Sequence, residues 1–347
     1  MATTAMPGRW RRIDRRAATL CRMLIERVGD FSLGWGESLV WDDRAERLYF
    51  VDCAAHILHW LEGGLGAHHT MTMPSMPAGI VPTEDGQLIG ALDDGLYVID
   101  PDGGTTRLLA AYPAGLGARA NDACADLSGN LITGTLNLEP AEGSSWWYSA
   151  REGWKLLDPD ISNTNGPNVC DVDGVITLLL GDSAADYYAY PYDAGAGSVG
   201  DRTVFGDVSG LAGVPDGAAL DSDGGMWCAL FGGSQLARFT PGGLERTLAL
   251  PVANPADVAL GPGTGPPLRR QRRAGGTRGD ARRRAARHRR ARLSRTRRTP
   301  LLVGLTAPGA RRPATRLERV ARQICSNDRV MRMTTSARPA SRCTRLA

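Results

Sequence analysis

Two carboxylates and one amide side chain each lie just before an apolar segment that predicts a strand. They are Glu37 in GESLVW, Asn165 in NTNGPN and Asp216 in VPDGAAL. Two carboxylates and an amide oxygen suit a hard divalent cation such as Ca²⁺, Mg²⁺ or Mn²⁺. Three protein ligands leave positions open for water and substrate, which is the layout of a catalytic metal. Asn163 offers a second amide, but Asn165 is preferred because a glycine follows it.

A second polar cluster lies in ARANDACADLSG, where Arg119 and Asn121 precede a turn and a strand. Arginine offers a planar fork for carboxylates or hydroxyls, and asparagine offers a donor and an acceptor. A salt bridge within the loop is the simpler explanation of this cluster. Glu139, the last residue of GTLNLE, is a weaker candidate. Ser183 in GDSAAD lacks the G-x-S-x-G context of a hydrolase nucleophile, so we set it aside.

A repeated turn-and-strand pattern must position these side chains. Turns with an acid or a glycine precede short strands at positions 43, 85, 128, 173 and 223, in steps of 42, 43, 45 and 50 residues. A period of this length, built from short strands, is typical of propeller blades. In a propeller, positions just before the inner strands converge at one end of the central channel. The pattern therefore predicts an all-β fold in which Glu37, Asn165 and Asp216 meet.

The two parts of the chain differ sharply in composition. Residues 265–347 contain 25 Arg and 3 acidic residues, whereas every aromatic residue lies at or before Phe239. The repeat predicts a sixth blade near residue 270, where this Arg-, Ala-, Gly- and Pro-rich tail begins. We therefore expect the sixth blade to be missing or disrupted, and we hypothesise a frameshift near residues 262–267. A basic tail for anionic surfaces and an Arg-rich disordered segment are the alternatives.

The predicted organisation is a basic extension at 1–22, a propeller of about five blades at 23–264, and the tail at 265–347. The extension lacks the apolar core of a secretory signal. No apolar run is long enough for a transmembrane helix, so we expect no membrane partner. The seven scattered cysteines contain no CxxC pair and indicate a reducing compartment, which predicts a cytoplasmic protein.

The segments GESLVWDD, RANDACADLSGNLITGT, ISNTNGPNVCDVDG and VPDGAALDSDGGMWCAL resemble the senescence-marker protein/gluconolactonase family, which includes regucalcin and bacterial sugar lactonases. The resemblance covers about residues 24–262. It implies a six-bladed propeller with one divalent metal ion (Ca, Zn, Mg or Mn) at the channel mouth. The metal ligands would be Glu37, Asn165 and Asp216, and the residues that contact the sugar would be Arg119, Asn121 and Glu139. Leu39 departs from the family, which often has proline there.

The resemblance implies metal-dependent hydrolysis of a sugar lactone, with Asp216 also acting as the catalytic residue that orients or deprotonates water. Two alternatives stay open: a non-catalytic, regucalcin-like calcium-binding protein, and an inactive, truncated or frameshifted propeller. Nucleic-acid binding rests on the charge of the tail alone, so we do not expect nucleic acid as a partner.

Overall fold

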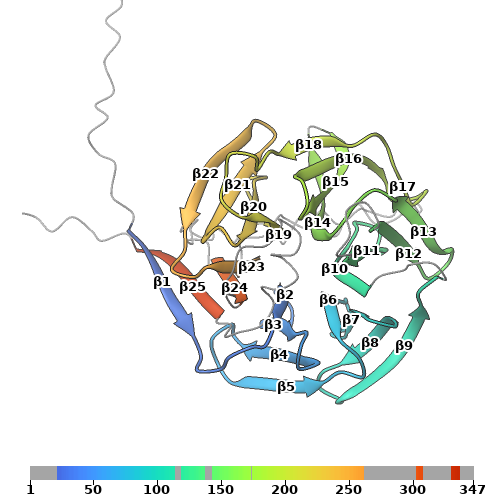
Figure 1. Cartoon of the computed structure of the whole chain (residues 1–347). Coiled ribbons are helices and arrows are strands. Elements are labelled where there is room, and N and C mark those ends of the chain that lie inside the picture. The colour runs from blue at the N-terminus through green and yellow to red at the C-terminus, as the bar shows by residue number, and fades with distance from the viewer. Residues whose placement is uncertain are drawn as a thin grey trace, which may run out of the picture.

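The regular structure of this chain is β throughout the part that the structure describes. The computed structural model describes residues 22–113, 119–136, 143–172, 174–261, 302–307 and 330–336. Within these residues the strands form antiparallel sheets arranged as a propeller around a central axis (Figure 1). None of the described residues forms a helix that could span a membrane.

Five sheets are each built from strands that follow one another in the chain. Sheet 1 contains β2 (Gly36–Asp42), β3 (Arg47–Asp52), β4 (Ile57–Glu62) and β5 (His68–Thr72). Sheet 2 contains β6 (Pro77–Pro82), β7 (Leu88–Leu92), β8 (Gly95–Asp100) and β9 (Thr105–Ala111). Sheet 3 contains β10 (Arg119–Ala125), β11 (Leu131–Leu136), β12 (Ser145–Ser149) and β13 (Gly153–Asp158).

The next two sheets continue the pattern. Sheet 4 contains β14 (Thr164–Val172), β15 (Val175–Asp182), β16 (Tyr187–Asp193), β17 (Ser198–Val199) and β18 (Thr203–Gly206). Sheet 5 contains β19 (Val214–Leu220), β20 (Met226–Phe231), β21 (Gln235–Thr240) and β22 (Gly243–Ala249). The turns predicted near residues 43, 85, 128, 173 and 223 fall between the first and second strands of these five sheets, which confirms the phase of the repeat.

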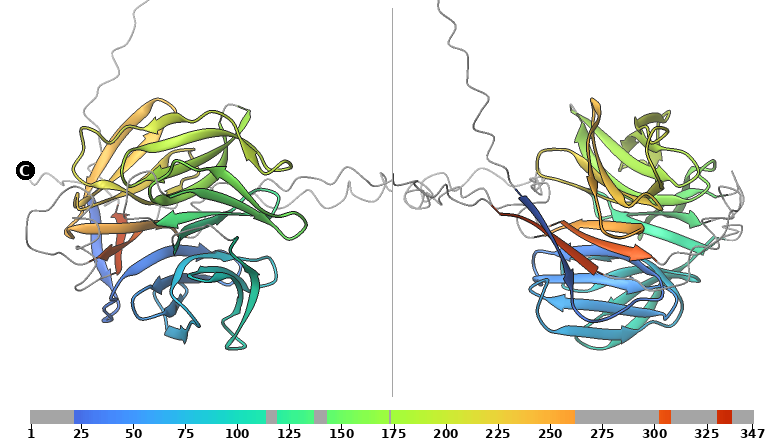
Figure 2. Two further views of the ribbon diagram at one scale, coloured as in Figure 1. Left: turned by 45° about the vertical axis from the view of Figure 1, so that its right-hand side comes forward. Right: turned by 60° about the vertical axis from the view of Figure 1, so that its left-hand side comes forward.

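A further sheet, sheet 6, joins the two ends of the chain. Its strand order is β1 (Arg22–Val28), β25 (Val330–Ser336), β24 (Leu302–Ala307) and β23 (Asn254–Leu260), with β23 innermost. The antiparallel ladder between β1 and β25 runs from the Arg22–Ser336 pair to the Val28–Val330 pair, and Figure 2 shows these two strands side by side. The first and last described strands therefore lie next to each other at the edge of sheet 6.

The described part of the tail contains two strands, β24 and β25, which its Arg-rich composition did not predict. The segments LVGLTA and VMRMTTS are poor in Arg compared with the rest of the tail, and their leucine, valine, methionine and threonine residues are compatible with strands. Ladder hydrogen bonds use the backbone, so such segments can pair with the free edges of β23 and β1. The other tail residues lie outside the described part of the chain, and the frameshift stays a hypothesis.

The hydrophobic core fills the spaces between neighbouring sheets. Tyr49 and Val51 of sheet 1 pack with Ile80 and Leu88 of sheet 2, and all four are almost fully buried. Trp227 of sheet 5 packs in the same way against Val258 of sheet 6. Burial of one such side chain stabilises the fold by about 1.5–3 kcal/mol. The sheets therefore hold their inner strands at fixed places around the axis.

The six inner strands share a bulge near the start of each strand. The register shifts occur at Glu37/Val40, Pro77/Gly79, Asn121/Ala123, Asn165/Asn168, Pro215/Ala218 and Pro255/Asp257. The inner strands contact one another in a closed ring, β2–β6–β10–β14–β19–β23. Bulges re-aim side chains and are common beside active sites. We use this repeat to name three sets of equivalent residues.

We call the residue at each bulge the second tier of the channel. We call the residue directly after it the link position. The first tier is the residue two places before the second tier, on the same side of the strand because side chains alternate. The second tier comprises Glu37, Ala78, Asn121, Asn165, Asp216 and Ala256. The first tier comprises Trp35, Met76, Arg119, Asn163, Val214 and Asn254. The link positions are Ser38, Gly79, Asp122, Gly166, Gly217 and Asp257.

The link positions join each inner strand to the next one in the ring. The side chains of Ser38, Asp122 and Asp257 accept hydrogen bonds from the amides of Ile80 (2.7 Å), Gly166 (2.7 Å) and Leu39 (2.5 Å), respectively. Glycine is needed where the strands approach more closely: a Cβ atom on Gly217 would lie 2.1 Å from Asp257 Oδ1. These contacts fix the spacing of the second-tier side chains across the channel.

Candidate functional site

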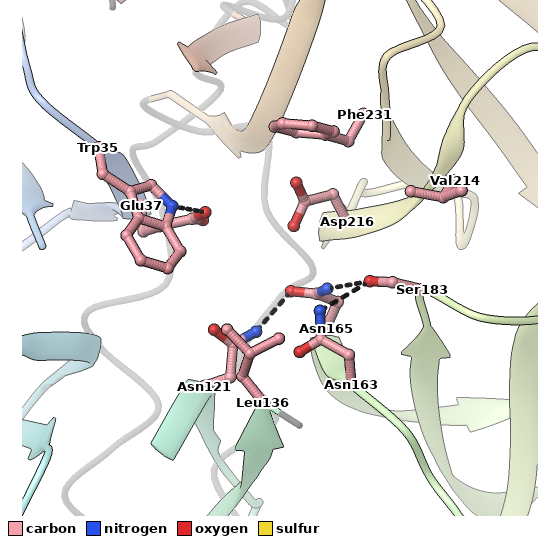
Figure 3. A pocket seen from close by; sticks show the side chains of 10 residues that line it. All are labelled: Trp35, Glu37, Asn121, Leu136, Asn163, Asn165, Ser183, Val214, Asp216 and Phe231. Carbon is pink, nitrogen blue, oxygen red and sulfur yellow. Dashed lines mark hydrogen bonds between the residues drawn. The ribbon is translucent and has the colours of Figure 1, made fainter. Parts of the chain in front are cut away.

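A pocket opens at one end of the channel, where the first and second tiers of several sheets meet (Figure 3). The pocket and the open space in front of it together hold about 390 Å³. Its lining residues are Trp35, Glu37, Asn121, Leu136, Asn163, Asn165, Ser183, Val214, Asp216 and Phe231. The structure thus brings together four of the six site residues expected from the sequence.

Glu37 is aimed by its own first-tier neighbour. Trp35 Nε1 donates a hydrogen bond of 2.8 Å to Glu37 Oε1, while the second carboxylate oxygen has no partner among the described residues. Burial is the main cause that raises the pKa of Glu37 to about 7, and the charge of Asp122 adds to it. The Trp35 hydrogen bond and the Arg119 charge act in the opposite direction. A positive charge in the pocket would therefore favour the ionised form of Glu37.

Asp216 is buried and held through its backbone. Tyr187 from sheet 4 accepts a hydrogen bond from the Asp216 amide at 2.9 Å and donates one to the Asp216 carbonyl at 2.6 Å. Burial is the largest cause that raises the pKa of Asp216 well above its usual value. The negative charges of Glu37, Asp257 and Asp122 raise this pKa further. Glu37 and Asp216 come from sheets 1 and 5, so the charge of Glu37 acts on Asp216 across the channel.

Three asparagine side chains and one serine form a hydrogen-bonded network on the wall of the pocket built from sheets 3 and 4 (Figure 3). Ser183 Oγ donates to the Pro215 carbonyl at 2.8 Å, so it must accept from the Nδ2 atoms of Asn163 (3.0 Å) and Asn165 (2.7 Å). Asn121 Nδ2 in turn donates to Asn165 Oδ1 at 3.0 Å and to the Thr164 carbonyl at 2.8 Å. Ser183 therefore turns both amide nitrogens toward itself and both amide oxygens away.

The polar atoms left without a partner in this pocket are oxygens. Each nitrogen of the lining side chains makes a protein hydrogen bond, whereas Asn163 Oδ1 is buried with no partner among the described residues. No described group donates to Asn121 Oδ1 or to the outer oxygen of Glu37. A buried oxygen without a donor is costly, so the pocket suits a cation or a ligand rich in hydroxyl groups.

The donor set is chemically suited to a hard divalent cation. Carboxylate oxygens of Glu37 and Asp216 and an amide oxygen of Asn165 are ligands of the type that such ions prefer. The described residues contain no cluster of three or more His, Cys, Asp or Glu side chains placed to hold a metal ion. The set found here has two carboxylates, and the other oxygens belong to amides.

Arg119 lies beside the pocket in the first tier of sheet 3. Its guanidinium group stacks over the Trp35 ring, 4.2 Å from the centroid, and Nη1 makes a long hydrogen bond of 3.4 Å to the Ala120 carbonyl. Its Nη2 atom is buried without a hydrogen-bond partner in the described part of the chain. The loop salt bridge, the simpler explanation of the Arg119 cluster, is absent among the described residues. The group therefore keeps donors available for a ligand.

Glu139 lies outside the described residues. The sequence did not point to Trp35 or Phe231, which are single aromatic residues before a strand and at a strand end. Ser183 was set aside because it lies outside a catalytic motif, and its role in the network was not foreseen. The sequence also placed Asn163 behind Asn165, whereas the structure lines the pocket with both. The assignment of Glu37, Asn165 and Asp216 as metal ligands stays a prediction.

Comparison with known proteins places the chain in a family. The model of the SMP-30/Gluconolactonase/LRE-like region matches residues 35–266. The chain belongs to this family. Within the SMP-30/gluconolactonase family, pentonolactonase XacC of Haloferax volcanii is 29% identical over 242 residues, which are 69% of this chain and 81% of that protein. The 6-deoxy-6-sulfogluconolactonase of Pseudomonas putida is 33% identical over 239 residues, covering 65% of this chain and 79% of that protein.

Solved structures show the same fold. The calcium-binding protein regucalcin from Agrobacterium tumefaciens superposes with a TM-score of 0.66 at 22% identity, covering 90% of this chain and 95% of that one. A luciferin-regenerating enzyme superposes with a TM-score of 0.70 at 20% identity, over 90% and 95% of the two chains. At these identities the likeness supports the propeller fold of the SMP-30/gluconolactonase family and nothing finer.

Proposed function

We propose that this chain is a metal-dependent hydrolase of sugar lactones, carried on a six-bladed propeller. The observation that carries the proposal is the pocket that gathers Glu37, Asp216 and three asparagines, where burial and the charge of Glu37 raise the pKa of Asp216. The family relatives named as lactonases support the substrate class. We further propose a cytoplasmic protein, which agrees with the free state of Cys53, Cys124, Cys170 and Cys228.

Glu37, Asn165 and Asp216 would hold one divalent cation, which could be Ca, Zn, Mg or Mn. When bound, such an ion supplies a Lewis acid that polarises the lactone carbonyl. Occupation would also relieve the repulsion between the two carboxylates and favour their ionised forms. Cation and substrate are thus expected to share the second tier of the channel.

The remaining steps belong to side chains of the chain itself. Asp216 would orient water and accept its proton, because the bound cation would keep its carboxylate ionised beside that water. Arg119 would donate hydrogen bonds to oxygens of the sugar, and Asn121 Oδ1 would accept one from a hydroxyl group. Val214 and Phe231 form an apolar wall beside Asp216 (Figure 3), and this wall limits the access of bulk water.

A non-catalytic calcium-binding protein is the rival function, because relatives named regucalcin match at 22–23% identity. In that function the same pocket would bind calcium without hydrolysing a lactone.

The test is ring opening of a panel of aldonolactones by the purified full chain, followed at constant pH with Ca²⁺, Zn²⁺, Mg²⁺ or Mn²⁺. The hydrolase proposal predicts turnover that EDTA abolishes and one of these ions restores. Cation binding without turnover of any lactone would favour the calcium-binding protein. Turnover that is unaffected by EDTA would contradict the metal dependence.

A further inference from the structure

Asn163 is a first-tier residue of the pocket whose role is not covered by the cation or by the expected sugar contacts. Asn163 occupies in sheet 4 the position that Arg119 occupies in sheet 3, two residues before the second-tier asparagine of its own strand. Leu136 connects the two positions: it pairs with Arg119 within sheet 3 and forms an isolated bridge to Asn163. Two strand spacings, about 10 Å, thus separate the backbones of Arg119 and Asn163.

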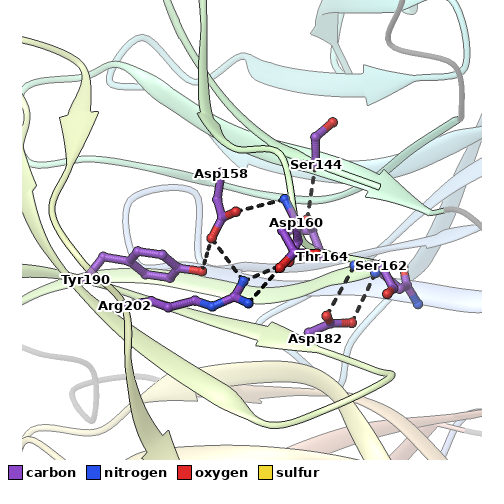
Figure 4. Close-up of polar contacts among 9 residues, drawn as sticks. Ser144, Asp158, Asp160, Ser162, Thr164, Asp182, Tyr190 and Arg202 are labelled. Carbon is purple, nitrogen blue, oxygen red and sulfur yellow. Dashed lines mark hydrogen bonds and ion pairs between the residues drawn. The ribbon is translucent and has the colours of Figure 1, made fainter. Parts of the chain in front are cut away.

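Hydrogen bonds and ion pairs hold the backbone of residues 158–164, the segment that contains Asn163 (Figure 4). Asp182, at the end of β15, accepts hydrogen bonds from the amides of Ser162 and Asn163, both at 3.2 Å. The preceding segment is fixed by Arg202, which bonds to the carboxylate of Asp160 at 2.9 Å and to that of Asp158 at 3.2 Å. In sheet 1, Asp52 holds the amides of Gly34 and Trp35 in the same way. First-tier residues are therefore positioned by a device that recurs in the fold.

The side chain of Asn163 is also fixed, and it offers a single kind of atom to the pocket. Its Nδ2 donates a hydrogen bond to Ser183 Oγ, and its Oδ1 is buried without a partner among the described residues. The side chain cannot rotate to offer the nitrogen instead, because Ser183 already gives its proton to the Pro215 carbonyl and cannot donate to an amide oxygen. A ligand must therefore present a donor to Asn163 Oδ1, whereas Arg119 demands an acceptor.

We propose that Asn163 determines substrate specificity by accepting a hydrogen bond from one hydroxyl group of the bound lactone. This inference rests on the proposed hydrolase function. A site built to bond a hydroxyl group rejects an analogue that lacks it, because the buried acceptor is then left unsatisfied. Asn163 requires a hydrogen-bond donor on the substrate and Arg119 requires an acceptor, so together they select a lactone that carries both groups. A deoxy sugar lactone lacking that hydroxyl would bind poorly.

The test compares wild type and Asn163→Leu on a parent aldonolactone and its single-deoxy analogues. Wild type should prefer the parent over one analogue by about 10-fold or more in kcat/KM, and the variant should reduce that preference to within about threefold. The parent reaction should slow by about 10- to 100-fold, while calorimetric affinity for the cation alone stays within about threefold. Asn168→Leu on the same strand removes hydrogen bonds to Gly166 and Ala218 outside the pocket and should slow parent and analogue alike.

A second measurement does not depend on turnover: calorimetric binding of the parent sugar acid and its deoxy analogues to the cation-loaded chain. If wild type binds the acid with the same hydroxyl preference but opens no lactone, the hydrolase proposal fails and the role of Asn163 stands. If Asn163→Leu keeps the preference in both rates and binding, the inference is overturned. A tenfold loss of cation affinity in this variant would instead make Asn163 a metal ligand, and a wild type that neither binds nor turns over these compounds would overturn both proposals.

Discussion

The two tiers of the channel mouth are built on the same strands but differ in chemistry. The second tier carries Glu37 and Asp216, whose pKa values are raised by burial and by neighbouring carboxylates. The first tier carries a tryptophan, an arginine, an asparagine and a valine at the corresponding places around the pocket. Two alanines, Ala78 and Ala256, complete the second tier and leave space beside the charged groups. One backbone repeat therefore supports two different tasks, two residues apart.

The difference shows how one propeller can hold the residues proposed for catalysis apart from those proposed to select the substrate. The second tier is fixed by bulges and link positions, which hold neighbouring inner strands at close range. The first tier is fixed by strand-end aspartates, Asp52 and Asp182, which hold the backbone ahead of the bulge. A change of Arg119 or Asn163 in the first tier should then alter which lactone is used, and a change of Glu37 or Asp216 in the second tier should remove the reaction.

The largest effect is expected from Asp216→Ala and Glu37→Ala. Each should abolish cation binding and lower lactone hydrolysis by at least about 10²–10³-fold, because each removes charge from the cation and from the reacting group. The surrounding strands should persist, since neither side chain is part of the apolar core. Calorimetry, circular dichroism and rate measurements check this, and full metal-dependent activity in either variant would show that the site is assigned wrongly.

A smaller effect is expected from Arg119→Ala. The stacked guanidinium is assigned to the sugar, so kcat/KM should fall by about 100-fold while cation affinity stays within about threefold. Arg119→Lys keeps the charge but loses the planar fork, and should recover only part of the loss. Parallel losses of cation affinity and turnover would place Arg119 with the second tier.

Ser183→Ala should act on both tiers at once. The hydroxyl group orients Asn163 and Asn165, so its removal frees both amides. The loss of one net hydrogen bond is worth about 1 kcal/mol, so we expect cation affinity and kcat/KM each to fall by about fivefold to tenfold. A total loss of turnover with an intact fold would instead point to Ser183 as a nucleophile.

The last effect concerns stability and not rate, and it is a pH dependence of unfolding in the metal-free chain. The pKa of Glu37 is raised from 4.5 to about 7, so the folded state keeps a proton that the unfolded state releases between these values. This contribution to stability is fully present below pH 4.5 and is lost as pH rises through 7. Urea unfolding in EDTA should show wild type losing about 1–3 kcal/mol relative to Glu37→Gln over this window. Parallel profiles would show that the carboxyl group titrates normally.

Much of this arrangement was visible in the sequence, because turns leave strong local signals. The recurring turns set the phase of five sheets and placed Glu37, Asn165 and Asp216 at equivalent strand starts. The pairing of β24 and β25 was missed, because their short apolar segments are hidden in an Arg-rich average. The Ser183 network was missed because its partners lie 18 to 32 residues away and meet only after the sheet folds.

The most direct measurement is a calorimetric titration of the metal-free full chain with a divalent cation at pH 6, in two buffers with different ionisation enthalpies. The account predicts one cation per chain, binding accompanied by proton release because the pKa of Glu37 is raised to about 7, and loss of both signals in Asp216→Asn. Absence of binding in wild type, or binding without proton release that Asp216→Asn leaves unchanged, would contradict a cation site at the channel mouth.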